Sequence, residues 1–300
     1  SQLKANKIGT SLAAAELELQ KTQLVRKVTQ QFYHIIYLMN KQAEYKIIDS
    51  LYDRYTIAAQ LQLEQGDISQ LEFLNAALQH QRITAEIQQL NHDLTIANVE
   101  FENLLQYDST FLIPYEPLQV LILPENYQYS ANELPVFEEN IKLQNALLDV
   151  ERNRLLPDIT LGYFNGTNSY ADAKNYDGYT IGIGVPLFFG EQKSKIKSGK
   201  IALEIAQIQF ENRKKLLANR KTILLQELTK YRESIALYEN SGKSLYDQML
   251  KTAREIYSKG LINYCQYVEN IKKVVGLRLE YLDKMAAYNH IVIQLKYLTL

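Results

Sequence analysis

The stretch that decides the fold is SLYDRYTIAAQLQLEQGDIS, residues 50–69, because a related stretch follows later in the chain. Moving the sequence by 194 residues (from 50 to 244) places it on SLYDQMLKTAREIYSKGLIN, residues 244–263. The first four residues are identical, and Gly66 coincides with Gly260 without a gap. Further identities in the same register are Tyr37 with Tyr231, Ile68 with Ile262 and Glu86 with Glu280. The chain therefore contains a duplicated unit, and one copy predicts the fold of the other.

Each copy is predicted to be a long helical hairpin. All six prolines lie between Pro114 and Pro186, so residues 1–113 and 187–300 lack this helix-breaking residue. Both flanks are rich in Leu, Gln, Glu, Lys, Ala and Ile, most of which favour helices. A glycine then interrupts each flank, and helices commonly end at a glycine in the left-handed conformation. The expected tips of the two hairpins are near 65–69 and 259–263.

The second copy also shows a regular apolar seam, with spacings that alternate between four and three residues. This is the heptad pattern of a packed or supercoiled helix. A helix from about Glu191 to Ser258 would be roughly 100 Å long at about 1.5 Å per residue, which suits a tube or a stalk. The seam consists of Leu224, Leu228, Tyr231, Ile235, Tyr238, Gly242, Leu245, Met249, Thr252 and Ile256.

The segment between the hairpins has a different character. Residues 111–134 contain several prolines and no clear period, so an irregular connector is predicted there. A short helix should follow over 135–157, because Pro135 suits a first helical turn and Pro157 ends the run. The predicted organisation is 1–110 first hairpin, 111–134 connector, 135–157 short helix, 158–190 β-hairpin and 191–300 second hairpin.

Residues 179–187, YTIGIGVPL, alternate apolar residues with small or weakly polar ones. A period of two over this length predicts a tilted strand that crosses a bilayer with one lipid-facing side. Residues 159–164 alternate more loosely, and the polar stretch 165–178 has the composition of a loop. The alternative is a soluble hairpin that buries one face on a protein core. The predicted lipid-facing residues are Tyr179, Ile181, Ile183, Val185 and Leu187.

Composition and motifs give no support to an enzyme. Lys and Arg number 33 against 34 for Asp and Glu, so no electrostatic attraction to nucleic acid is expected. The sequence contains no glycine-rich phosphate loop, no Gly-x-Ser-x-Gly and no His-Glu-x-x-His. A single cysteine, Cys265, excludes an internal disulfide and is expected to be a buried small residue. We therefore predict no catalytic residue, no cofactor and no metal site.

The order of short helix, strand hairpin and long helical hairpin in a duplicated chain resembles the TolC-type outer-membrane efflux family. Residues 154–161, RLLPDITL, are similar to that family's approach to a strand, and 185–190, VPLFFG, to its exit from the next one. The tips 66–69, GDIS, and 260–263, GLIN, are similar to its helix-hairpin turns near the periplasmic end. Within the family, the overall resemblance leans towards the heavy-metal branch, which is CusC- and CzcC-like.

The resemblance implies a mainly α fold, with two very long antiparallel helical hairpins and one β-hairpin that contributes to a transmembrane β-barrel. It implies a homotrimer in the bacterial outer membrane that extends into the periplasm and passively conducts metal cations or drugs. The implied partners are outer-membrane lipid, a periplasmic adaptor and an inner-membrane resistance–nodulation–division pump. The expected adaptor contacts are Gly66, Asp67, Ile68, Ser69, Gly260, Leu261, Ile262 and Asn263. Asp67 and Glu269 are candidates for charge at a lumen constriction.

The sequence departs from the family in one respect. The family duplicates the strand hairpin as well as the helices, whereas here only the second copy has strands. Since Ser1 aligns with Lys195 in the 194-residue register, we expect that a segment with a short helix and two strands is missing before Ser1. The alternative function, from another class, is a soluble periplasmic coiled-coil scaffold or adaptor protein.

Overall fold

The computed structural model describes residues 2–106, 112–124, 127, 133–167, 171, 174–185 and 189–298. The chain divides into two units. The first unit comprises Ser1–Lys21 and Ala131–Ala218, and the second comprises Thr22–Ser130 and Asn219–Leu300. The helices α1 and α4 each run from one unit into the other.

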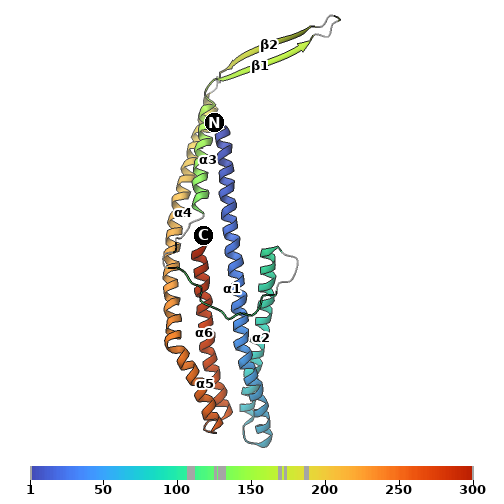
Figure 1. Cartoon of the computed structure of the whole chain (residues 1–300), viewed down its shortest axis with the longest axis vertical. Coiled ribbons are helices and arrows are strands. Elements are labelled where there is room, and N and C mark those ends of the chain that lie inside the picture. Colours follow the sequence, from blue (N-terminus) through green and yellow to red (C-terminus); the bar gives the residue numbers. More distant parts are fainter. Residues whose placement is uncertain are drawn as a thin grey trace. The chain divides into compact units, whose positions relative to one another are not determined.

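The described part of the chain is mainly helical and contains one pair of strands, which confirms the predicted fold class (Figure 1). The helical hairpins are α1–α2 and, after α4, α5–α6, and residues 112–124 form a connector without regular secondary structure. One π-helical turn, η1, joins α4 to α5, so the helical run continues from Phe189 to Ser258. The elements are α1 Gln2–Gln65, α2 Gln70–Leu105, α3 Leu134–Asn153, β1 Asp158–Thr167, β2 Asn175–Gly184, α4 Phe189–Leu237, η1 Tyr238–Gly242, α5 Lys243–Ser258 and α6 Tyr264–Lys296.

Both hairpins turn through the same backbone geometry. Gly66 and Gly260 have φ angles of 80° and 70°, in the left-handed region that glycine adopts without strain. In the first turn, Gly66 N–H donates to the carbonyl of Leu63, and the next N–H donates to that of Gln62. The second turn repeats both bonds 194 residues later, from Gly260 to Tyr257 and from Leu261 to Ile256. This pair of bonds satisfies carbonyls that the end of a helix leaves without partners.

The helix that follows each turn begins with a capping box. The Ser69 side chain accepts from the N–H of Glu72, and the Glu72 carboxylate accepts from the N–H of Ser69. Asn263 and Gln266 make the same reciprocal pair at the start of α6. These bonds satisfy N–H groups at the start of the helix, so each tip is fixed on both sides of its glycine. The repeated sequence is therefore also a repeated structure.

The predicted seam of the second copy is correct before η1 and wrong after it. Leu228 is buried as expected, but Leu245 is 56% exposed and Met249 is also exposed. The buried residue of α5 is instead Ala253, which is 4% exposed. A π-helical turn holds one residue more than an α-helical turn, so the buried positions after it move along by one. Heptad spacing in the sequence does not reveal such an insertion.

Aromatic packing holds the π-helical turn. The ring of Tyr238 stacks on Tyr281 of α6, with centroids 4.0 Å apart. The Tyr281 hydroxyl donates to the Glu239 carboxylate at 2.8 Å. A Cβ on Gly242 would lie only 3.0 Å from the Tyr238 ring, so glycine provides the space that this arrangement needs. In the first copy the corresponding stretch, 44–48, remains α-helical.

The core of the second unit lies between the two hairpins. One buried cluster joins α1 and α2 to α5 and α6, and another lies between α1 and α2. This burial provides the main hydrophobic stabilisation of the paired hairpins. The first cluster consists of Ile48, Tyr52, Ile83, Ala253, Val268, Ile271 and Val275, and the second of Ile35, Leu38, Leu90, Ala97 and Phe101.

Two buried asparagines hold the connector against the helices of the second unit. Each amide donates to a carbonyl of the connector and accepts from the N–H two residues further on, as a neighbouring strand would. Backbone groups that no regular structure pairs are thereby satisfied. The pairs are Asn40 with Glu116 and Leu118, at 2.7 and 3.2 Å, and Asn289 with Gln119 and Leu121, both at 2.7 Å.

The first unit packs α3 against the N-terminal parts of α1 and α4. Ala5 of α1 is buried with Ala146 and Val150 of α3. The helix α4 approaches α3 closely at Gly199, where a Cβ would lie 3.2 Å from the Leu148 side chain. Small residues at these positions allow the helix backbones to come together.

The two tip glycines are expected to be essential for stability. Gly66→Ala and Gly260→Ala should each lower the free energy of unfolding by about 1–2 kcal/mol, because alanine is strained in the left-handed conformation. Gly276→Ala is the matched control, since Gly276 lies within α6 and nothing lies within 4 Å of its added Cβ. It should stabilise the protein by up to about 1 kcal/mol. Denaturant titrations measure all three, and equal effects at all three glycines would contradict the prediction.

Candidate functional site

The β-hairpin places large apolar side chains on one face. The strands pair in antiparallel register, with Ile159 opposite Ile183, Leu161 opposite Ile181 and Tyr163 opposite Tyr179. Because side chains alternate along a strand, these six residues share a face. The predicted lipid-facing residues Tyr179, Ile181, Ile183 and Val185 are 82, 74, 71 and 57% exposed, and Leu187 lies outside the described residues. No described part of the chain covers this face.

The opposite face of the hairpin carries small side chains near its base. Thr160 lies opposite Gly182, and Gly162 opposite Thr180. Further along, two aromatic residues, Phe164 and Tyr176, interrupt this pattern. The Phe164 ring lies over Gly178, where a Cβ would come within 2.4 Å of the ring. Near the base of the hairpin, the two faces thus differ sharply in apolar surface.

Polar contacts mark the far end of the apolar face. The rings of Tyr163 and Tyr179 lie with centroids 5.4 Å apart. The Tyr163 hydroxyl and the Asn165 amide both donate to the carboxylate of Asp177, at 2.7 and 2.6 Å. Tyrosines are enriched where apolar lipid meets the polar interface, because the ring is apolar and the hydroxyl is wet.

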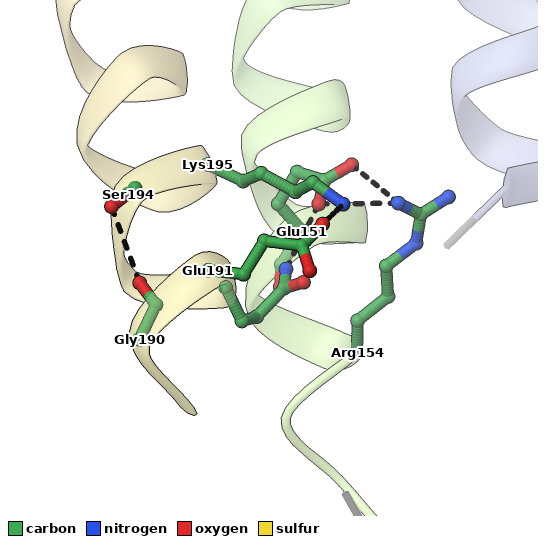
Figure 2. A network of polar contacts seen from close by, with 7 residues as sticks. Glu151, Arg154, Gly190, Glu191, Ser194 and Lys195 are labelled. Atoms are coloured by element: carbon green, nitrogen blue, oxygen red, sulfur yellow. Dashed lines mark hydrogen bonds and ion pairs between the residues drawn. The ribbon is translucent and has the colours of Figure 1, made fainter. Parts of the chain in front are cut away.

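A network of polar contacts at the base of the β-hairpin joins α3 to α4 (Figure 2). The Glu151 carboxylate accepts from the Arg154 guanidinium at 2.9 Å and from the Gln192 amide at 2.9 Å. Gln192 also donates to the Glu151 carbonyl at 2.6 Å. One helical turn further along α4, Lys195 pairs with Glu191 at 2.6 Å. These contacts fix the helix ends from which the two strands extend.

The predicted adaptor-contact residues all lie in the two tips. Gly66, Asp67 and Ser69 are exposed, as are Gly260, Leu261 and Asn263. Ile68 and Ile262 are half-buried below them. The side chains of Ser69 and Asn263 already accept hydrogen bonds in the capping boxes. The tip groups that remain most available to a partner are therefore Asp67 and Leu261.

The two candidates for lumen charge differ in their surroundings. Asp67 is exposed at the first tip. Glu269 accepts a hydrogen bond from the hydroxyl of Tyr52, at 3.2 Å, across the interface between the hairpins. Burial raises the pKa of the Tyr52 hydroxyl, and the negative charge of Glu269 raises it further. Glu269, although exposed, therefore links the two hairpins through this hydrogen bond, a role that the sequence did not indicate.

The expectation for Cys265 is wrong, because its side chain is exposed. It lies in the first turn of α6, and the first buried residue of that helix is Val268, in the next turn. Its counterpart in the first copy, Leu71, is also exposed. Among the described residues, no three His, Cys, Asp or Glu side chains gather where they could hold a metal ion.

Within the ranges that the structure describes, no helix combines sufficient length with sufficient hydropathy to cross a membrane.

The sequence matches no protein-family model and no curated protein. Solved structures, in contrast, match nearly the whole chain. The CmeC outer-membrane channel of Campylobacter jejuni superposes with a TM-score of 0.83 at 14% identity, over 98% of this chain and 66% of CmeC. A membrane protein from Pseudomonas aeruginosa gives 0.85 at 15% identity, over 98% of this chain and 69% of its own. CusC, solved in a study of folding and transmembrane channel formation, superposes with a TM-score of 0.80 at 16% identity, over 98% of this chain and 72% of CusC.

The chain has the fold of TolC-type outer-membrane channels. At these identities the likeness establishes the fold, and it agrees with the resemblance in the sequence. The chain spans 66% of the length of CmeC.

The packing role of Tyr52 can be measured. Tyr52→Phe should lower the free energy of unfolding by about 1–1.5 kcal/mol, because a hydrogen bond is lost while the exposed Glu269 carboxylate is hydrated instead. Tyr246 is the corresponding residue of the second copy, and its hydroxyl has no hydrogen bond to a described residue. Tyr246→Phe is therefore the control and should change stability by less than about 0.5 kcal/mol.

The same bond sets a dependence on high pH. The folded protein raises the pKa of Tyr52 above its usual value of 10.0, so it retains a proton that the unfolded chain loses. This contribution to stability is complete below about pH 10 and is lost as pH rises further. As pH rises above about 10, the free energy of unfolding should therefore fall more steeply for the wild type than for Tyr52→Phe. Denaturant titrations at a series of alkaline pH values measure this difference. Parallel curves for the two proteins would contradict this assignment.

Proposed function

We propose that the chain forms part of an outer-membrane channel, the passive duct of a tripartite efflux system. The observation that carries the proposal is the apolar face of the β-hairpin, which no described residue covers. Large aliphatic side chains on paired strands would be costly in water, whereas lipid accommodates them. The proposed location is the bacterial outer membrane, with the helical hairpins in the periplasm.

A homotrimer is part of this proposal. Within the first unit, α4 carries an exposed apolar stripe at heptad spacing, formed by Ile201, Ile205 and Ile208. Such a stripe is typical of a helix that packs against another helix, and each further copy of the chain would bring both hairpins. Three copies around one axis would supply helices for a tunnel and strands that contribute to a barrel, whose closure leaves no free edges.

We propose that the tips contact a periplasmic adaptor that is itself paired with an inner-membrane pump. The pump supplies the energy, and the channel only conducts. Asp67 and Leu261 offer a charge and an apolar side chain at the exposed ends of the hairpins. The cargo class is metal cations or drugs.

One substitution on each face of the β-hairpin tests the lipid-facing assignment. Ile181→Lys places a charge on the apolar face, where it should cost about 2–4 kcal/mol near the middle of the bilayer. Thr180→Lys is the matched control, because Thr180 is adjacent to Ile181 in the sequence and lies on the opposite face of the hairpin. After expression in a bacterium with an outer membrane, the amount of protein recovered in that membrane should fall for Ile181→Lys and remain unchanged for Thr180→Lys.

The outcome also separates the two function classes. If both variants and the wild type are recovered without detergent as soluble protein, the duct is wrong and a periplasmic coiled-coil scaffold is favoured. If both variants lose membrane recovery equally, the assignment of faces is wrong.

A further inference from the structure

A basic surface lies next to the strands, at the start of α4. Residues 193–200, KSKIKSGK, contain four lysines, all of them exposed. Lys193, Lys197 and Lys200 recur at intervals of four and three, so they share one side of the helix. All three lie within twelve residues of Phe189, the first residue of α4, which follows β2 after a short linker.

The positive charge on this side of α4 is not neutralised within the described chain. Lys195 is paired with Glu191, and Arg154 with Glu151, so the carboxylates at the base of the hairpin already have cationic partners (Figure 2). Lys193, Lys197 and Lys200 have no ion pair to another described residue. The nearest acidic residues of α4 in sequence are Glu191, which is paired, and Glu204.

A second element adds lysines at the same end of the first unit. Ala5 and Ile8 of α1 pack against Ala146 and Val150, in the last part of α3 before the strands. This packing brings Lys4 and Lys7, both exposed, to the end of α3 from which β1 extends. Two helices therefore contribute lysines beside the base of the β-hairpin, and none of these lysines except Lys195 has an ion pair with a described residue.

We infer that Lys193, Lys197 and Lys200, with Lys4 and Lys7, form a binding surface for the anionic headgroups of phospholipids. Two observations favour a lipid surface as the occupant. The charge is complementary to phosphate, and the surface continues directly from the apolar face of the strands, which the proposed function places in lipid. Long lysine side chains can reach from a helix end to headgroups at the boundary of a bilayer. Attraction of this kind strengthens membrane binding by about fivefold for each lysine near the surface.

The inference rests on the proposed function, and vesicle flotation can separate the two. Binding of the protein to neutral phosphatidylcholine vesicles reports insertion of the strands. The additional binding to vesicles that contain phosphatidylglycerol reports the lysines. For the triple variant Lys193→Gln, Lys197→Gln and Lys200→Gln, binding to neutral vesicles should be unchanged. Its preference for anionic vesicles should fall by about a hundredfold, which is three lysines at about fivefold each.

The matched control changes net charge equally at another place. Lys243→Gln, Lys251→Gln and Lys259→Gln remove three exposed lysines from α5 and the second tip, and they should leave the anionic preference intact. The preference of the wild type should also weaken as ionic strength rises. A triple α4 variant that retains the wild-type preference would overturn the inference, as would an equal loss in the α5 control.

Two further outcomes are informative. Inorganic phosphate at millimolar concentration should not displace the protein from anionic vesicles, and complete displacement would overturn the assignment to a lipid surface. If the protein fails to bind neutral vesicles but still binds anionic ones, the proposed function fails while the lysine surface stands.

Discussion

Packing between the two helical hairpins is the interaction on which the second unit depends. Neither hairpin can bury its own apolar stripe completely, and each covers apolar side chains of the other. Tyr52 is central to this contact, because its ring lies in the shared core while its hydroxyl reaches Glu269 of the other hairpin. The hydroxyl of Tyr264 likewise reaches back to the carbonyl of Leu51 at 3.2 Å. Both tyrosines combine apolar burial with a polar link, which helps to explain why a chain without tryptophan has 22 tyrosines.

The duplicated halves are not equivalent in their packing, although they align without a gap. Their tips share the same hydrogen bonds, and Ala59 and Ala253 are both buried at equivalent positions. On the N-terminal side of the π-helical turn, equivalent positions no longer have the same burial. Ile35 is buried, whereas its counterpart Thr229 is exposed. One extra residue within a helical turn rotates everything before it relative to everything after it. Two similar sequences thereby present different faces to their neighbours.

The base of the β-hairpin connects folding to the proposed function. Strands with a large apolar face are stable only if their backbone is paired and their apolar side chains are removed from water, by lipid or by a protein core. The Glu151, Arg154 and Gln192 contacts position the strands at the ends of α3 and α4, and the unpaired lysines of α4 begin within the next turns. An apolar surface followed closely by positive charge is the arrangement expected at the boundary between lipid and water.

The sequence by itself determined the two hairpins, their turns and the presence of the strands. The bounds of the strands differ from the prediction, since β1 runs to Thr167 and β2 begins at Asn175, within the stretch 165–178 that was predicted as a loop. Proline, glycine and hydrophobic periodicity act locally, so Gly66, Gly260 and the alternation over 179–185 could be interpreted without knowledge of any partner. The tertiary structure alone decided which side chains meet across elements. The π-helical turn depends on Tyr281, more than forty residues away, and the connector is held by Asn40 and Asn289 from two different helices. The exposure of Cys265 and the bond between Tyr52 and Glu269 are of the same kind. A local pattern fixes the backbone of an element, but contacts between distant residues exist only once the elements are packed.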